Sequence, residues 1–149
     1  MELKQRITDE MKAAMKSGEK SRLATIRLIL SAIKQIEVDE RIESLPDDRV
    51  LASLDKMVKQ RRESISQYEK AGRDDLANQE KSELVIIQEF LPAALSEDEI
   101  NNLINDAIQS SGAASIKDMG KVMAIIKPQM QGRADMGKVS GQIKSRLNA

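Results

Sequence analysis

Apolar residues recur at intervals of three and four residues along nearly the whole chain, which is the spacing of one face of an α-helix. Few residues interrupt this pattern, because the 149-residue sequence contains only 7 Gly and 3 Pro. A fold built from strands would need more turns, and turns concentrate Gly and Pro. The sequence therefore predicts an all-α protein, with a helical bundle of about four helices followed by a small three-helix domain.

Four helices are expected before residue 95. The first begins near Leu3 and ends at Gly18, and the second runs from Ser21 to Ile36 with an apolar stripe wide enough for a central, buried helix. Residues 37–48 are acidic and contain a proline, so they are expected to form a solvated connection. Asp47 or Asp48 is then expected to cap the third helix.

The third and fourth helices are expected at residues 49–71 and 76–91. The third contains a polar stretch at residues 59–64, KQRRES, which we expect to lie mostly in water. Gly72 ends this helix, and Pro92 closes the fourth helix.

A new helical region begins after the segment LPAAL. Ser96 and Glu99 have the spacing of a capping box, in which each residue's side chain bonds the other's backbone N–H. We therefore expect a domain boundary near residue 95, which gives domains at 1–95 and 96–149. The second domain is expected to contain helices at 96–111, 115–131 and 135–148, with Pro128 kinking or shortening the middle helix.

The composition excludes several classes of function. Tyr68 and Phe90 are the only aromatic residues and there is no Trp, so the chain lacks a stacking platform for single-stranded nucleic acid. It contains no Cys and no His, which excludes disulfide frameworks, the usual zinc sites, cysteine nucleophiles and Ser-His-Asp triads. We expect no cofactor, no metal site and no catalytic residue.

Three patterns resemble catalytic motifs but have simpler interpretations. GRADMGKV, at residues 132–139, matches the phosphate-loop pattern except that Val139 replaces the required Ser or Thr, and a helix precedes it instead of a strand. SxxK occurs at Ser17 and Ser31 without a nearby glycine-rich oxyanion loop. The acidic pairs 47–48 and 74–75 lie at helix starts, where capping explains them.

The charge distribution is uneven although the formal net charge is zero, with 24 basic and 24 acidic residues. Residues 1–112 sum to −5 and residues 113–149 sum to +5. Residues 96–112 carry four acidic residues and no basic residue, which sharpens the boundary. A basic segment of this kind indicates a charged partner.

The basic segment contains an internal repeat. DMGKVMAIIK at 118–127 and DMGKVSGQIK at 135–144 agree at seven of ten positions, which predicts a helical hairpin with two similar faces. Lys121 and Lys138 occupy the same position in the two copies, in the first turn of each helix, where backbone N–H groups favour phosphate. Solvated surface is the equally plausible alternative. The stretch at Lys59, Arg61 and Arg62 is a weaker basic candidate.

Seven basic residues are the candidate nucleic-acid contacts: Lys117, Lys121, Lys127, Arg133, Lys138, Lys144 and Arg146.

The tail sequence KDMGKVMAIIKPQMQGRADMGKVSGQIKSRL resembles the C-terminal tail of the B subunit of glutamine-dependent tRNA amidotransferase. The stretches MKAAMKSGEKSRLATIRLILSAIK and KQRRESISQYEKAGRDDLANQEKSELVIIQEFLP look like the free-standing members of the GatB/YqeY family. The resemblance implies an all-helical protein whose tail recruits tRNA, while the catalytic region of the B subunit has no counterpart here. It also implies that small residues and one aspartate shape the tail motif: Gly120, Gly132, Ala134, Asp135 and Gly137.

The expected function is therefore a non-catalytic tRNA-binding accessory module. Its expected partners are tRNA or other structured RNA and enzymes of aminoacyl-tRNA metabolism. The family resemblance implies one alternative, a contribution to carbon–nitrogen ligase activity with glutamine as amide donor. A second alternative is a helical protein-interaction adaptor that uses the acidic helix at 96–111.

The sequence contains no hydrophobic stretch that approaches the ~18 residues needed to span a bilayer. It begins Met-Glu-Leu-Lys, which does not resemble a secretion signal. These features predict a soluble cytoplasmic protein with no membrane partner.

Overall fold

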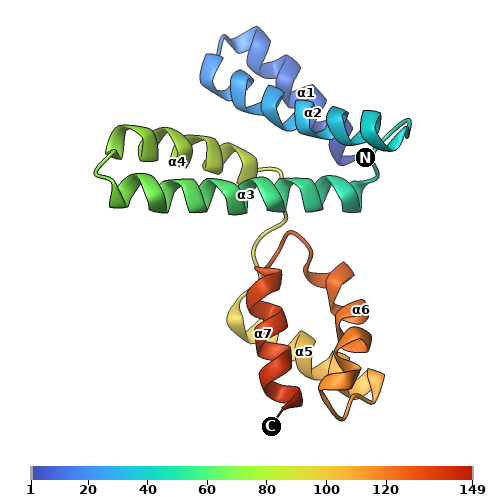
Figure 1. Cartoon of the computed structure of the whole chain (residues 1–149). Helices are drawn as coiled ribbons and strands as arrows, with labels where there is room; N and C mark the ends of the chain where they lie inside the picture. The colour runs from blue at the N-terminus through green and yellow to red at the C-terminus, as the bar shows by residue number, and fades with distance from the viewer. Residues whose placement is uncertain (1, 149) are drawn as a thin grey trace. The chain divides into compact units, whose positions relative to one another are not determined.

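The computed structural model describes residues 2–148, which form seven α-helices, one short 3-10 helix and no β-strand (Figure 1). This confirms the all-α prediction. The chain divides into an N-terminal unit, Met1–Pro92, and a C-terminal unit, Ala93–Ala149. The helices are α1 (Leu3–Ser17), α2 (Lys20–Glu40), α3 (Asp47–Lys70), α4 (Asp74–Gln88), α5 (Glu97–Ser111), η1 (Ile116–Asp118), α6 (Met119–Met130) and α7 (Met136–Leu147).

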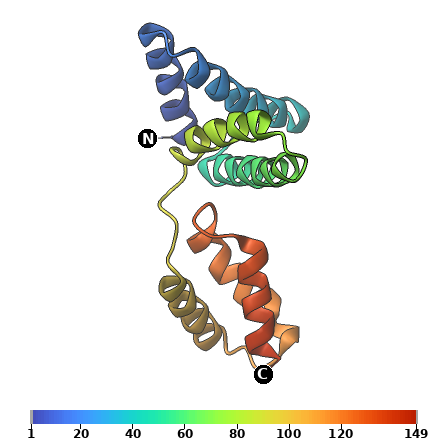
Figure 2. The ribbon, with the colours of Figure 1, turned by 90° about the vertical axis from the view of Figure 1, so that its left-hand side faces the viewer.

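The N-terminal unit consists of two helical hairpins, α1–α2 and α3–α4, and the two helices of each hairpin run antiparallel (Figures 1 and 2). Ile26, Ile29 and Ile33 of α2 are buried because their spacing places them on one helix face. The core residues of this unit are Ile7, Ala14, Ile26, Ile29, Ile33, Leu45, Val50, Leu54, Val58, Ile87 and Phe90.

The connection between α2 and α3 is shorter than the segment 37–48 that we expected. Both expected bounds of this connection are wrong. The helix α2 continues to Glu40, and α3 begins at Asp47. Glu37 explains why α2 continues past residue 36. Its side chain is only 3% exposed, and its carboxylate is bonded within the unit. It accepts hydrogen bonds from Lys4 Nζ at 2.7 Å and from the backbone N–H of Leu45 at 2.8 Å.

The acidic pairs at helix starts do not cap these helices, contrary to expectation. The N-cap position of α3 is Pro46, and Asp47 instead accepts a hydrogen bond from the backbone N–H of Leu3 at 2.8 Å. The N-cap position of α4 is Arg73, whose guanidinium donates to both carboxylate oxygens of Asp75 at 3.1 Å. These aspartates therefore hold the chain through side-chain pairs and a contact between helices.

The polar stretch at 59–64 is mostly exposed, as expected, and Arg61 and Ser64 are its two half-buried residues. Arg61 is only 17% exposed, because it packs against the acidic face of α4. Its Nε lies 3.1 Å from Glu83 and 3.6 Å from Glu80. The ion pair lets a charged residue occupy the α3–α4 interface.

The C-terminal unit contains α5, α6 and α7 around its own apolar core. The capping box is confirmed, since Ser96 Oγ accepts from the Glu99 N–H at 3.1 Å and Glu99 accepts from the Ser96 N–H at 3.3 Å. Gly112 ends α5 in the left-handed conformation, with φ of 69°. The core residues are Ile100, Ile104, Ala107, Val122, Ile126, Met130, Val139, Ile143 and Leu147.

The expected helix 115–131 differs at its start, where residues 116–118 form the 3-10 helix and α6 begins at Met119. Pro128 lies inside α6, which ends two residues later at Met130. Among residues 2–148, no helix combines the length and apolar content that a membrane span requires.

Candidate nucleic-acid interface

The lysines of α6 and α7 lie on the outward faces of the two repeat helices. Lys121, Lys127, Lys138 and Lys144 are all exposed, while Val122 and Val139, the residues next to the first lysine of each copy, are buried. Within each helix the two lysines are six residues apart, which places them about 120° apart around the axis. They therefore border the outward face on both sides and do not form a single row.

The helices α6 and α7 run antiparallel, so their first turns lie at opposite ends of the hairpin (Figures 1 and 2). Lys121 lies at the end where α7 finishes, and Lys138 lies at the end where α6 finishes. The positive charge is thus distributed along the hairpin, and Lys117 extends it into the 3-10 helix. A surface of this kind suits an extended polyanion better than a single phosphate group.

Small residues lie between the bordering lysines. Gly120 and Ala124 of α6 correspond to Gly137 and Gly141 of α7, and all four are exposed. A Cβ atom placed on Gly120 or Gly141 would meet no atom within 4 Å. Packing within the unit therefore does not require glycine at these positions, which leaves the helix backbone open to close approach by a ligand.

The two arginines among the candidate contacts are bonded inside the unit. Arg146 donates to the side chains of Asn105 and Asn101, the latter at 2.6 Å, and so ties the end of α7 to α5. Arg133 Nε donates to the carbonyl oxygen of Ala93 at 3.2 Å, and its own carbonyl accepts from the Leu95 N–H at 2.8 Å. Both arginines hold the fold of the unit.

Arg133 belongs to the turn between α6 and α7, which bends at Gly132 with a φ of 78°. The N–H groups of Arg133 and Ala134 donate to the Met130 carbonyl at 2.8 and 3.2 Å. The left-handed backbone at Gly132 makes this turn possible, because residues with a Cβ rarely adopt it.

The aspartates of the two repeat copies behave differently. Asp135 caps α7 and accepts from the N–H groups of Gly137 at 2.9 Å and Lys138 at 3.4 Å. Asp118 instead accepts from the Ala114 N–H at 2.9 Å, and this hydrogen bond lowers the pKa of its carboxyl group. Lys121 Nζ lies 3.7 Å from Asp118, which also favours the charged carboxylate.

The acidic helix α5 does not neutralise the candidate lysines. Among residues 2–148, the single ion pair of the C-terminal unit joins Lys121 to Asp118, and Lys121 remains 70% exposed. Glu99 is used in the capping box, and Glu97 accepts from Gln142 at 3.4 Å. The lysines therefore keep their charge available to a partner.

The sequence reasoning missed the partners of the arginines. Asn101 and Asn105 contact Arg146 from 45 and 41 residues away, and no local spacing indicates such a pairing. The amide residues carry no charge, so the charge count did not reveal them either.

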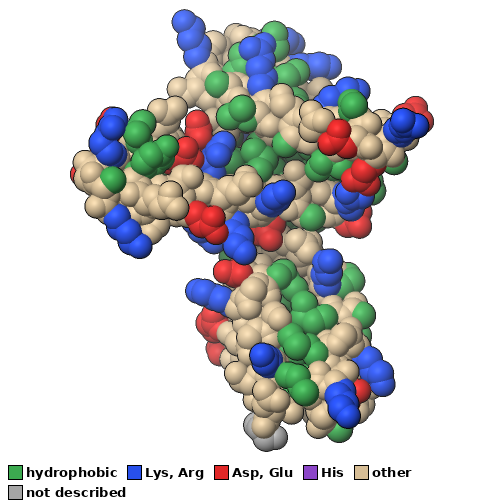
Figure 3. Space-filling view, in the orientation of Figure 1, with side chains coloured by type: hydrophobic (Ala, Val, Ile, Leu, Met, Phe, Trp, Pro, Cys, Tyr) green, Lys and Arg blue, Asp and Glu red, His purple; other side chains and the backbone are tan. Residues whose placement is uncertain are grey.

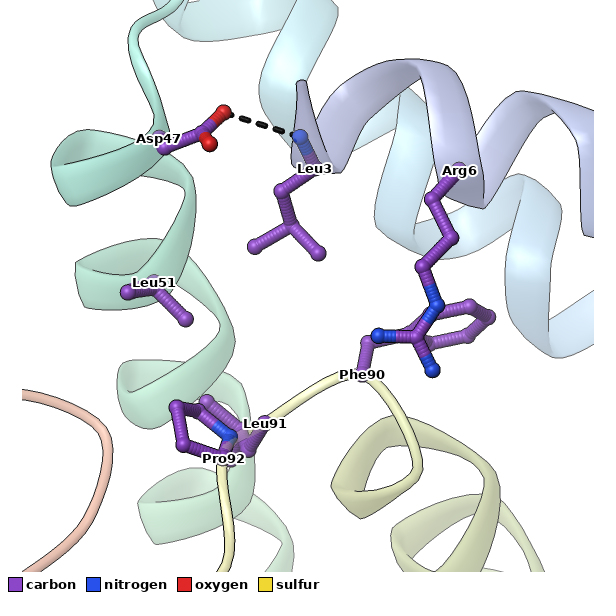
Figure 4. A pocket seen from close by; sticks show the side chains of 7 residues that line it. All are labelled: Leu3, Arg6, Asp47, Leu51, Phe90, Leu91 and Pro92. Carbon is purple, nitrogen blue, oxygen red and sulfur yellow. Dashed lines mark hydrogen bonds between the residues drawn. The ribbon is translucent and has the colours of Figure 1, made fainter. Parts of the chain in front are cut away.

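A shallow cavity of about 280 Å³ lies in the N-terminal unit between the start of α1, α3 and the end of α4 (Figure 4). Arg6 lies over the ring of Phe90, 5.5 Å from its centroid, and donates to the Glu89 carbonyl at 3.1 Å. The rest of the lining is mainly aliphatic. Within the described part of the chain, no group of three acidic residues could hold a metal ion.

The chain belongs to the Yqey-like protein family, whose model matches residues 4–147. It is similar to fungal proteins called "Altered inheritance of mitochondria protein 41, mitochondrial". It is 35% identical to the one from Lachancea thermotolerans, over 75% of this chain and 63% of the relative. Identity is 32% to that of Vanderwaltozyma polyspora, over 74% and 63%, and 30% to that of Pyrenophora tritici-repentis, over 97% and 80%.

The chain thus spans about 63% of the length of the first two relatives. The expectation of a cytoplasmic location is wrong, because the names of these relatives place them in mitochondria. The length of apolar stretches and the first residues of the chain, on which the expectation was based, do not identify a compartment inside the cell.

Proposed function

We propose that this chain is a non-catalytic RNA-binding module whose C-terminal unit contacts the phosphate backbone of a structured RNA. The observation that carries the proposal is the set of exposed lysines on η1, α6 and α7, only one of which is ion-paired within the described residues. Lysine ammonium groups bind phosphate without reading sequence. The contacts are Lys117, Lys121, Lys127, Lys138 and Lys144.

Arg133 and Arg146 have a positioning role in this proposal. Their hydrogen bonds to Ala93, Asn101 and Asn105 fix the ends of the α6–α7 hairpin and therefore fix where its lysines lie. We propose a domain boundary near residue 95, with the RNA-binding domain at 96–149, and the hydrogen bond from the Leu95 N–H to the Arg133 carbonyl ties the residue before this domain to the α6–α7 turn.

Transfer RNA is the RNA we propose, because the tail resembles that of the amidotransferase B subunit. Relatives named for mitochondria make mitochondrial tRNA the first probe to use. In this proposal the chain delivers or retains tRNA for an enzyme of aminoacyl-tRNA metabolism and performs no transfer of its own.

The test is binding of labelled tRNA to the full chain over a range of salt concentrations. If three or four phosphates are neutralised, the logarithm of affinity should fall against the logarithm of salt with a slope near −3, at roughly 0.7–0.9 per phosphate. The double variant Lys121→Gln, Lys138→Gln should flatten this slope by about 2, and Lys56→Gln, Lys70→Gln on α3 serves as the matched control. No retention at low salt, or a slope near zero, would refute the proposal.

A further inference from the structure

The α1–α2 hairpin carries a second concentration of positive charge that the total for residues 1–112 conceals. Between residues 11 and 36 there are six basic residues and a single acidic residue, Glu19, so this stretch sums to +5. This equals the charge of residues 113–149, in a shorter stretch. Acidic residues of α3 and α4 offset it in the sum for the unit, as do five acidic residues of the same hairpin outside residues 11–36: Asp9, Glu10, Glu37, Asp39 and Glu40.

Three of these basic residues lie on one face of α2. Lys20, Arg27 and Lys34 are spaced by seven residues, which is close to two helical turns, and all three are exposed. Ala24 and Ser31 lie between them on the same face and are also exposed. The row extends about 21 Å along the helix, at 1.5 Å per residue.

Two lysines at the end of α1 continue this charge. Lys12 and Lys16 are one turn apart and both are exposed. Because α1 and α2 form a hairpin, the end of α1 lies beside the start of α2 (Figure 1). Figure 3 shows basic and apolar side chains over this end of the hairpin, with few acidic ones.

Six of the twelve other basic residues of this unit form ion pairs: Lys4, Arg22, Arg49, Arg61, Arg73 and Lys81. Arg22 is bound by Glu10 and Glu89, Arg61 lies between Glu80 and Glu83, and Lys81 lies 3.4 Å from Glu69.

By contrast, no described carboxylate lies within 4.0 Å of Lys12, Lys16, Lys20, Arg27 or Lys34.

The local sequence explains why two of these residues have no partner. No acidic residue occurs three or four positions before or after Lys20 or Arg27. Lys34 is three residues from Glu37, but that buried carboxylate is bonded by Lys4, and Lys34 acts on it only at longer range. These charged groups therefore have no carboxylate partner among the described residues.

We propose that Lys20, Arg27 and Lys34, together with Lys12 and Lys16, form a second contact surface for the phosphate backbone of the same RNA. We call this surface the α2 basic face. The inference rests on the proposed function, since it assigns the N-terminal unit a share in binding the RNA that the C-terminal unit holds. Two linked contact surfaces raise the overall affinity without requiring either to bind tightly alone.

An anionic membrane is the competing occupant of this face. Leu28 is 48% exposed and Val38 is 58% exposed, and basic residues beside apolar ones also suit a lipid surface. RNA is favoured because alanine and serine, which offer little apolar area, separate the three cations of the row.

The experiment compares three charge-neutralised full-length proteins with the wild type for binding of labelled tRNA at 50–200 mM salt. The α2 variant is Lys20→Gln, Arg27→Gln, Lys34→Gln. The tail variant is Lys121→Gln, Lys138→Gln, Lys144→Gln. The control is Lys56→Gln, Lys70→Gln, Lys81→Gln, which removes the same charge from α3 and α4. Circular dichroism confirms that each variant keeps its helix content.

We expect the α2 variant to bind tRNA at least about tenfold more weakly than the control, at two- to fivefold per lost contact. With both surfaces engaged, the wild-type salt slope should be steeper than the value near −3 expected from the C-terminal unit alone, and the α2 variant should lose about 2 to 3 of that slope. Combining the α2 and tail substitutions should weaken binding more than either set alone.

The outcomes separate this inference from the proposed function. If the wild type binds tRNA and the tail variant is impaired while the α2 variant matches the control, this inference is wrong and the proposed function stands. If the wild type does not retain tRNA, both are wrong. A loss of binding to phosphatidylglycerol vesicles, with tRNA binding equal to the control, would assign the face to a membrane and overturn the inference.

Discussion

The two units use charged side chains in different ways. In the N-terminal unit, ion pairs join helices to one another: Lys4 to Glu37 between α1 and α2, and Arg61 to Glu83 between α3 and α4. In the C-terminal unit, the arginines donate to neutral oxygens instead, as Arg146 does to Asn101. Its lysines are exposed.

The comparison separates charged side chains that are paired within the fold from those that remain available to a partner. A cation held by a carboxylate must give up that pair before it can bind phosphate, whereas an exposed lysine gives up only water. On the C-terminal hairpin and the α2 basic face, a polyanion therefore meets little competition from carboxylates. Substitutions that separate structural from unused charges test this division.

Glu37→Gln should produce the largest loss of stability among the charge substitutions, about 2 kcal/mol in the free energy of unfolding. The buried carboxylate accepts from Lys4 and from the Leu45 backbone, and a neutral amide binds both less strongly. Urea denaturation followed by circular dichroism measures this. Glu40→Gln, which breaks the exposed pair with Arg49, is the control and should cost far less.

The same residue predicts a pH dependence. The hydrogen bond from Lys4, and then that from Leu45, lowers the pKa of Glu37 below its ordinary value of 4.5. The contribution of the Glu37 carboxylate to the free energy of unfolding is therefore present above about pH 4.5 and is lost as the pH falls through the lowered pKa. The difference between wild type and Glu37→Gln should shrink below pH 4.5, and a constant difference would contradict this assignment.

Arg146→Gln should cost about 1.5 kcal/mol, because charge-assisted bonds to two asparagines are lost. Amide hydrogen exchange should increase at α5 and at the end of α7, and not in α1–α4. Lys144→Gln, two residues away and exposed, is the matched control and should leave exchange unchanged. Equal effects of the two substitutions would mean that Arg146 is as unused as the lysines.

Gly120→Ala should stabilise the protein by about 0.5 kcal/mol, since alanine favours helix and the added Cβ meets no atom within 4 Å. Gly137→Ala should gain less, because its Cβ would lie 3.2 Å from the capping oxygen of Asp135. Thermal unfolding compares the two variants directly. Equal gains for the two variants would show that the two repeat copies begin their helices alike and would contradict this prediction.

The fold could be predicted from local signals, and the site only in part. Spacing of apolar residues gave the helices, and Ser96 with Glu99 gave the start of α5, because both signals act within a few residues. The roles of Glu37 and Arg146 depend on partners 33 and 45 residues away, which no spacing reveals. The charge sum over residues 1–112 conceals the α2 basic face, because acidic residues on α3, α4 and α5 and on the remainder of α1 and α2 cancel it.

Substitution of Lys121 and Lys138 by Gln should have the smallest effect on stability. Their ammonium groups support no other helix, and the Asp118 pair of Lys121 is exposed and local. Unfolding should therefore change by no more than about 0.5 kcal/mol. The salt dependence of tRNA binding should nevertheless become less steep by about 2.

Stability and tRNA binding should therefore respond differently to the loss of an unpaired charge. Substitution of a cation that is paired within the fold changes both stability and binding, whereas substitution of an unpaired cation changes binding alone. If the double variant unfolds more easily by about 1 kcal/mol or more, its lysines belong with Arg61 and Lys4 among the charges that hold helices together. The lysines of the α6–α7 hairpin would then not be the residues that bind a phosphate backbone.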